Sequence, residues 1–161
     1  MKLYIIAFFA IILFCGSQAK VDPLCIQKGQ TGSCDFYQCF EKKRQCGSTG
    51  YLTYGYKYCN IYHSFFNKFT KEGKKWAECF GPCLSKLLIP KYKESVGAGK
   101  QCAELTTFAL GTKNTCYKEC GFCGMYEANK LVLKDIYADQ TDPIAVRAYK
   151  IVLHAANQCY G

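Results

Sequence analysis

The most reactive side chains in this sequence are its thiols. Of the 13 cysteines, twelve lie after residue 19 and are spread over the whole remaining chain. Thiols form disulfides, bind metals or act as nucleophiles, and the redox compartment decides among these uses. The two histidines, His63 and His154, lie in helical patterns and not in a metal-ligand spacing such as HExxH. The sequence therefore predicts no catalytic residue, no cofactor and no metal site, and it predicts that the thiols form disulfides.

Known catalytic motifs give no alternative use for these residues. One CxxC motif occurs, at Cys120 and Cys123, but this motif indicates redox chemistry only beside a βαβ pattern, which the chain lacks. Neither a GxSxG motif nor a glycine-rich phosphate loop is present. A secreted phospholipase A2 needs a His-Asp pair beside paired cysteines, whereas His63 is followed by Ser64. We therefore expect that the protein is not an enzyme.

Residues 1–19 have the pattern of an export signal. Lys2 precedes an apolar run over residues 3–14, and residues 17–19, Ser-Gln-Ala, fit a signal-peptidase site. The apolar run is about 12 residues long, whereas crossing a bilayer needs roughly 20. We therefore expect cleavage after Ala19, a secreted, extracellular protein, and no transmembrane anchor.

Cleavage would remove Cys15 and leave an even number of cysteines in an oxidising compartment, so all of them could pair. Each bridge contributes on the order of 2–4 kcal/mol, and such a chain does not need a large core. The remaining residues, 20–161, match the common size of one domain, and no linker rich in proline, serine or glycine interrupts them. The sequence therefore predicts one disulfide-rich domain.

The charge of the mature chain is strongly positive. Of the 21 Lys and Arg residues, Lys2 is lost with the signal, which leaves 20 against 12 Asp and Glu, or a net charge of about +8. The basic residues concentrate in residues 42–44, 71–75 and 91–100. They could be solvated helix faces and loops, or they could attract an anionic glycan, lipid or protein. We expect no nucleic-acid partner.

The pattern of apolar residues predicts the elements that hold these cysteines. Apolar residues recur at steps of three and four, which is typical of helices, and no stretch shows sustained two-residue alternation. The helical stretches are residues 51–70, 74–88, 102–110, 116–123, 125–137 and 144–159. The sequence therefore predicts an all-α fold: a single disulfide-rich helical domain of about five helices, ending in an antiparallel helical hairpin.

Glycine and proline residues predict where these helices end. Gly81 and Pro82 are expected to kink or restart the second helix, and Pro90 is expected to end it. Gly111 is expected to stop the third. Residues 141–143, Thr-Asp-Pro, supply a cap and a proline at the first position of the last helix.

The order and spacing of the cysteines also form a pattern over nearly the whole mature chain. Residues 25–41 read as C-x8-C-D-F-Y-Q-C-F-E, and later intervals are Cys102-x13-Cys116, Cys116-x6-Cys123 and a long one to Cys159. This pattern resembles the stanniocalcin family of secreted disulfide-rich glycoprotein hormones, whose opening is C-x8-C-x-x-F-x-C-L-E. Residues 20–161 would then form a stanniocalcin-like helical domain.

The resemblance implies five bridges: Cys25–Cys39, Cys34–Cys59, Cys46–Cys102, Cys83–Cys116 and Cys123–Cys159. Cys79 and Cys120 are left over, and each lies about one helical turn from a member of the Cys83–Cys116 bridge. Two antiparallel helices joined by that bridge would bring these two cysteines opposite one another. We therefore predict a sixth bridge, Cys79–Cys120. The helical register independently supports only this ladder of two bridges.

The chain departs from the family in three respects. It contains no Asn-x-Ser/Thr site, so N-glycosylation is not expected. It ends two residues after Cys159, without the family's extension that carries an intermolecular cysteine; we expect no disulfide-linked dimer, while a noncovalent dimer stays possible. The segment before Cys59 is rich in tyrosines, which either pack in the core or form an exposed contact patch: Tyr51, Tyr54, Tyr56 and Tyr58.

The resemblance implies a secreted non-enzymatic regulatory protein. It would be a stanniocalcin-like hormone that acts on calcium and phosphate homeostasis or inhibits an extracellular metalloprotease, with an extracellular receptor or protease as its partner. The alternative is a cationic membrane-active or anionic-ligand-binding secreted effector, because saposin-like proteins also combine disulfide-linked helices with positive charge. The usual six-cysteine spacing of saposin-like proteins does not occur here.

Overall fold

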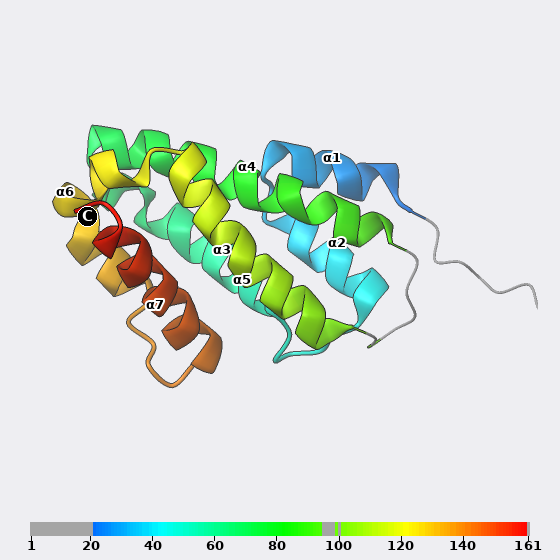
Figure 1. Ribbon diagram of the computed structural model, residues 1–161. Helices are drawn as coiled ribbons and strands as arrows, with labels where there is room; N and C mark the ends of the chain where they lie inside the picture. The colour runs from blue at the N-terminus through cyan, green and yellow to red at the C-terminus, as the bar shows by residue number, and fades with distance from the viewer. Residues whose placement is uncertain (1–20, 95–98, 100, 161) are drawn as a thin grey trace, which may run out of the picture.

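The computed structural model describes residues 21–94, 99 and 101–160, and the expected signal segment lies outside these residues. The described residues form helices and no strands, which confirms the predicted all-α, disulfide-rich fold (Figure 1). Within the described ranges there are seven α-helices and one short 3₁₀-helix: α1 (Pro23–Thr31), α2 (Asp35–Arg44), α3 (Tyr51–Phe65), η1 (Phe66–Lys68), α4 (Lys71–Lys93), α5 (Cys102–Glu119), α6 (Phe122–Ile136) and α7 (Pro143–Asn157).

The three helices α3, α4 and α5 form the centre of the molecule. Figure 1 shows the α1–α2 pair and the α6–α7 pair on opposite sides of these long helices. The longest helix, α4, packs against α1, α2, α5 and α6, while α3 packs against α2, α5 and α6. The core therefore lies around α3 and α4, and much of it is aromatic.

The helix count exceeds five because α1 and α2 arise in residues 23–44, where no helix was predicted. The signals for α1 are clear in hindsight: the Asp22 carboxylate accepts a hydrogen bond from the Leu24 N–H, and Pro23 occupies the first helical position. Gly32 ends the helix with φ 75°, a backbone conformation that favours glycine. In α2, Phe36 and Phe40 are fully buried one turn apart.

Two proline residues lie inside α4, which runs unbroken from Lys71 to Lys93. The prediction that Pro90 ends this helix is wrong, and Pro82 does not start a new one. An internal proline costs a helix roughly 3 kcal/mol, because one hydrogen bond is lost and the ring crowds the preceding turn. One stripe of buried side chains runs along the whole helix and offsets this cost: Trp76, Phe80, Leu84, Leu88 and Tyr92.

Gly111 lies in the middle of α5, which continues to Glu119, so the predicted stop at this glycine is also wrong. A glycine inside a helix costs only about 1 kcal/mol relative to alanine. Buried side chains on both sides, Ala109 and Cys116 among them, hold the helix together through this position. The predicted cap and proline before the last helix are confirmed, because the Asp142 carboxylate accepts hydrogen bonds from two backbone N–H groups and Pro143 opens α7.

Six disulfides join the described residues: the five pairs that the resemblance implies and the Cys79–Cys120 pair expected from the helical register. Two of them, Cys79–Cys120 and Cys83–Cys116, form consecutive rungs between α4 and the end of α5. The remaining bridges are Cys25–Cys39, Cys34–Cys59, Cys46–Cys102 and Cys123–Cys159. The last joins the start of α6 to the residue beyond α7, so these helices form the predicted antiparallel hairpin.

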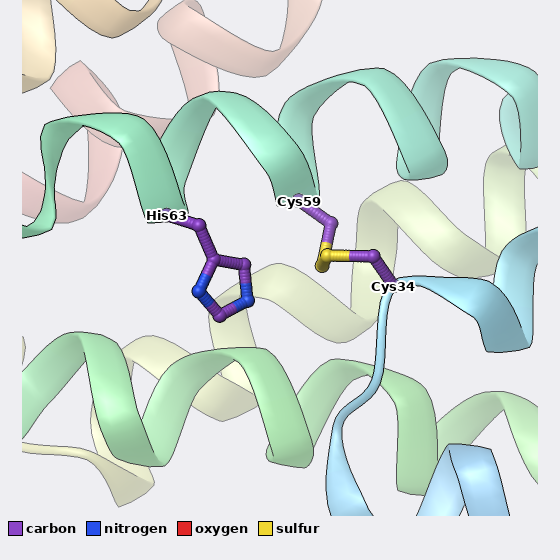
Figure 2. A group of neighbouring side chains, drawn as sticks. All are labelled: Cys34, Cys59 and His63. Atoms are coloured by element: carbon purple, nitrogen blue, oxygen red, sulfur yellow. A yellow bond between two sulfur atoms is a disulfide. The ribbon is translucent and has the colours of Figure 1, made fainter.

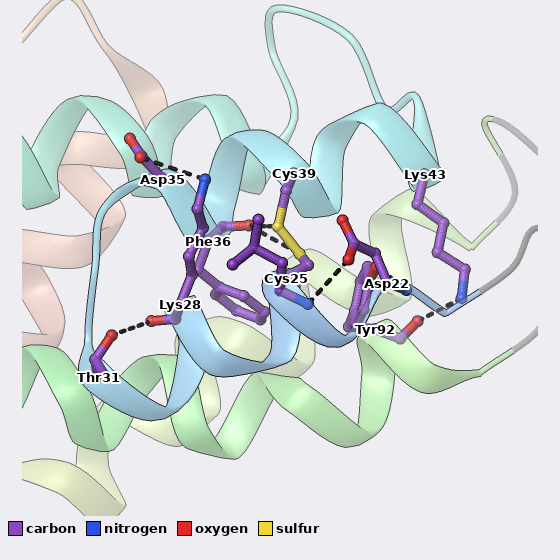
Figure 3. Close-up of a disulfide and its surroundings, with 10 residues drawn as sticks. Asp22, Cys25, Lys28, Thr31, Asp35, Phe36, Cys39, Lys43 and Tyr92 are labelled. Carbon is purple, nitrogen blue, oxygen red and sulfur yellow. Dashed lines mark hydrogen bonds and ion pairs between the residues drawn. A yellow bond between two sulfur atoms is a disulfide. The ribbon is translucent and has the colours of Figure 1, made fainter.

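Two residues of the basic run 42–44 have a structural role. The Lys43 ammonium donates a hydrogen bond to the Tyr92 carbonyl at 2.8 Å (Figure 3). Arg44 donates one to the Lys91 carbonyl at 3.2 Å. These carbonyls belong to the last turn of α4, where no intrahelical N–H is available. Arg44 is only 2% exposed, so it is a helix cap and not part of a surface that attracts anions.

Gly55 provides a test of the packing between α2 and α3. A Cβ atom at this position would lie 2.5 Å from the Tyr37 ring, and Tyr37 is itself buried. We expect Gly55→Ala to lower the free energy of unfolding by about 1–3 kcal/mol, as measured by guanidinium denaturation of the oxidised protein.

The matched control is Gly111→Ala, because nothing lies within 4 Å of a Cβ atom built there. This change is expected to raise the free energy of unfolding by about 0.5–1 kcal/mol, since alanine favours the helical backbone. If the two substitutions changed the free energy of unfolding by the same amount, whether up or down, the close approach of α2 and α3 at Gly55 would be contradicted.

Candidate functional site

The tyrosines of α3 lie mainly in the core and not in an exposed patch. Tyr51, Tyr54 and Tyr58 are each at most 5% exposed, and Tyr56 is partly buried on another side of the helix. Tyr51, Tyr54 and Tyr58 follow one another at steps of three and four and therefore lie on one stripe of the helix, which Tyr62 continues toward the end of α3. The stripe forms one wall of a pocket.

The pocket has a volume of about 390 Å³ and lies between α3 and α4. Its inner wall combines the buried tyrosines of α3 with Phe80 and Leu84 of α4. The exposed residues Thr31, His63 and Glu78 also line it, and because they contact solvent they mark its entrance. This size and this mostly apolar lining are typical of sites for small molecules.

Lys113 reaches into this pocket from α5 and is only 3% exposed. Its ammonium nitrogen lies 3.4 Å from the hydroxyls of Tyr54 and Tyr137 and 5.3 Å from the centres of both rings. Among the described residues, no carboxylate forms an ion pair with it. The pocket therefore contains a buried amine whose contacts are two phenol groups.

Burial lowers the pKa of Lys113 to about 7, because the low-dielectric interior disfavours the charged ammonium. Burial raises the pKa of the two neighbouring phenols, to about 12 for Tyr137 and further for Tyr54. At neutral pH the hydroxyls are therefore protonated, and the lysine exchanges between its charged and neutral forms. The charged form has room in the pocket for a negatively charged partner.

The sequence did not predict this site, although it contained a signal for it. Lys113 lies four residues after Ala109 and four before Tyr117, so it falls on the apolar stripe of one helix. With the predicted stop at Gly111, Lys113 falls in the gap between the predicted helices 102–110 and 116–123 and not on a helical face.

A second group with suitable chemistry comprises the α3 residues Cys59 and His63 and the neighbouring Cys34 (Figure 2). The sulfur atoms and a ring nitrogen all lie within 4.8 Å of one another, as in a metal site. However, Cys34 and Cys59 are joined in a disulfide, and a metal requires free thiolates. In the oxidised protein this group is a bridge with an exposed histidine next to it.

The CxxC cysteines and His154 do not form a reactive group either. Cys120 and Cys123 of the CxxC motif belong to different disulfides, with Cys79 and Cys159 respectively, and so do not form a redox pair. His154 is exposed on α7, where its Nε2 atom lies 3.0 Å from the side-chain nitrogen of Gln158. The twelve cysteines of the described residues are all bonded in pairs.

Together, the fold and the site define an all-α, disulfide-linked protein with an aromatic pocket that encloses a lysine. No family model matches the chain, and neither a curated protein nor a solved structure matches it. Functional conclusions therefore depend on the side chains described above.

Proposed function

We propose that this protein is a secreted, non-enzymatic regulatory protein of the stanniocalcin type, which acts by binding another extracellular protein. The observation that carries the proposal is the disulfide framework. Five of the six bridges are the pairs that the resemblance implies, and the sixth adds a rung to one of them. This number of disulfides is typical of proteins that fold in an oxidising compartment.

The framework also favours binding over catalysis. Bridges between α4 and α5 and between α1 and α2 hold the helices in fixed positions, and a preorganised surface loses less entropy when it binds a partner. None of the helices in the described ranges is long and apolar enough to cross a membrane. The partner would be a receptor, through which the protein acts on calcium and phosphate homeostasis, or an extracellular metalloprotease that it inhibits.

The alternative is a saposin-like effector that binds anionic membranes, which the net charge of about +8 of the mature chain favours. Such a protein needs a continuous apolar face to enter a bilayer. In the part of the chain that the structure describes, the exposed large apolar side chains are instead distributed over four helices and the segment after α7: Leu24, Phe108, Leu131, Leu153 and Tyr160. In addition, Arg44 serves as a buried helix cap, so part of the positive charge has a structural explanation.

Two measurements on the same oxidised protein test the proposal. In a pull-down from the extracellular fluid of the source organism, we expect saturable capture of one protein partner, and the reduced and alkylated chain serves as the unfolded control. The captured protein is then assayed for metalloprotease activity with and without the oxidised chain. At physiological salt, vesicles containing phosphatidylserine are expected to stay intact. Leakage of these vesicles at low protein concentration, without a saturable partner, would overturn the regulatory proposal in favour of the membrane-active one.

A further inference from the structure

The pocket between α3 and α4 has no role in the regulatory function proposed above, and its chemistry indicates a ligand of its own. We propose that it binds a small amphipathic carboxylate, such as a medium-chain fatty acid. The carboxylate would pair with the Lys113 ammonium, and the apolar chain would lie between the tyrosine rings of α3 and the side chains of Phe80 and Leu84.

The case for a negatively charged group begins with the cost of burying Lys113. An ammonium group carries three donors, and removing it from water is expensive unless it is paired and hydrogen-bonded. Here its two hydrogen-bond partners are the neutral hydroxyls of Tyr54 and Tyr137, both at 3.4 Å. A carboxylate beside the ammonium would supply the missing negative charge and accept a short, charge-assisted hydrogen bond.

The case for a long apolar body comes from the walls of the pocket. The buried lining residues other than Lys113 are aromatic or aliphatic, with phenol hydroxyls as their polar atoms. A volume of about 390 Å³ lies at the lower end of the range for small-molecule sites. A compact anion such as inorganic phosphate would leave most of this apolar surface uncovered, whereas an alkyl chain would cover it.

The titratable groups that line the pocket around Lys113 come from three helices and from the residue that follows a fourth. They are Tyr37 of α2, the α3 residues Tyr51, Tyr54, Tyr58, Tyr62 and His63, Glu78 of α4, and Tyr137 after α6. Burial raises the pKa of the phenols among them, so the phenols are neutral at pH 7. His63 and Glu78 are exposed at the entrance, where their side chains contact water. Among the described lining residues, Lys113 is thus the one charged group in the interior.

The experiment compares dodecanoate with dodecanol, which has the same chain and no charge, by calorimetry on the full oxidised protein. A charge-assisted hydrogen bond in a buried site is expected to give dodecanoate at least a tenfold advantage at pH 6.5. Because only protonated Lys113 pairs with the carboxylate, the advantage is expected to decrease as the pH rises from 6.5 to 9. Inorganic phosphate is expected to show no binding.

The variant Lys113→Met keeps an unbranched side chain that is one atom shorter and removes its charge. It is expected to bind the two ligands equally. The control is Lys118→Met, which removes an exposed lysine of the same helix and is expected to keep the wild-type preference.

Dodecanoate is also expected to raise the pKa of Lys113, which NMR of lysine labelled at Cε can measure. Equal affinities in the wild-type protein, a preference that persists in Lys113→Met, or an unchanged lysine titration would overturn the proposal. The wild-type comparison decides the matter even if this variant fails to fold.

Discussion

Replacing Lys113 with methionine is expected to stabilise the protein at pH 6.5 by about 2–4 kcal/mol. The lysine pKa falls from 10.5 to about 7 on folding because the ammonium loses its hydration in the pocket. A shift in this direction means that the folded state binds the proton less tightly than the unfolded state does, which is a cost to folding. Methionine has a similar shape and occupies the same space without that cost.

The pH dependence follows from the same shift. The cost is fully present below pH 7, where both states bind the proton, and it disappears as the pH rises toward 10.5, where neither does. The free energy of unfolding of the wild-type protein is therefore expected to rise between pH 7 and pH 9. The buried tyrosines act in the opposite direction only above about pH 10, where phenols of the unfolded chain ionise. In Lys113→Met the rise between pH 7 and pH 9 is expected to be absent.

Guanidinium denaturation of the oxidised protein at pH 6.5, 7.5 and 9 measures both effects. Lys118→Met is the control for loss of one positive charge, and its stability is expected to change with pH as that of the wild type does. A Lys113→Met protein that is less stable than the wild type at pH 6.5, or that keeps the alkaline rise, would show that the lysine is not an unfavourable buried charge.

The second large effect concerns the two rungs between α4 and α5. Cys79–Cys120 closes a loop with a sequence separation of 41, and Cys83–Cys116 closes one of 33 inside it. When one of these two bridges is intact, the other closes only the small ring of about ten residues that lies between them, so removing either pair alone is expected to lower the free energy of unfolding by about 2–3 kcal/mol. When both bridges are absent, the large loop between α4 and α5 is no longer closed either, and the expected decrease is about 6 kcal/mol.

Alanine variants of each pair and of all four cysteines, followed by guanidinium denaturation, test this nesting. The inner pair is expected to be the more costly of the two, because Cys116 is fully buried whereas Cys79 is exposed. Peptide mapping of the unreduced wild-type protein provides the control for the pairing itself. If the variant lacking all four cysteines were no less stable than either variant lacking two, the two bridges would not form one ladder.

The sequence predicted those parts of the fold that depend on local patterns. The helical periodicity that predicts α3 and the Asp142 cap of α7 are both signals carried by residues a few positions apart, and the helix and the cap are confirmed. The predictions failed where packing between distant segments overrides a local signal. Pro90 and Gly111 both lie inside helices because buried residues on either side hold those helices against their neighbours.

The candidate site was harder to predict because its parts come from distant segments. The two hydroxyls beside Lys113 belong to residues 59 positions before it and 24 positions after it. Helical periodicity places each of these side chains on a face of its own helix, but it does not indicate which faces meet. The position of Lys113 on a buried stripe could have been found from sequence alone; the pocket around it required the arrangement of α3, α4 and α5.

The six disulfides also divide the chain into two covalent bodies. Five of them overlap in sequence, from Cys25–Cys39 to Cys79–Cys120, so a single cut of the backbone anywhere from residue 25 to residue 120 leaves both fragments tied together. The sixth encloses residues 123–159 alone, and no bridge crosses the short link at Gly121 and Phe122. Tyr137 belongs to this second body, while Tyr54 and Lys113 belong to the first. The boundary between the two bodies therefore passes through the pocket, where one wall is held in place by packing and hydrogen bonds instead of a covalent bridge.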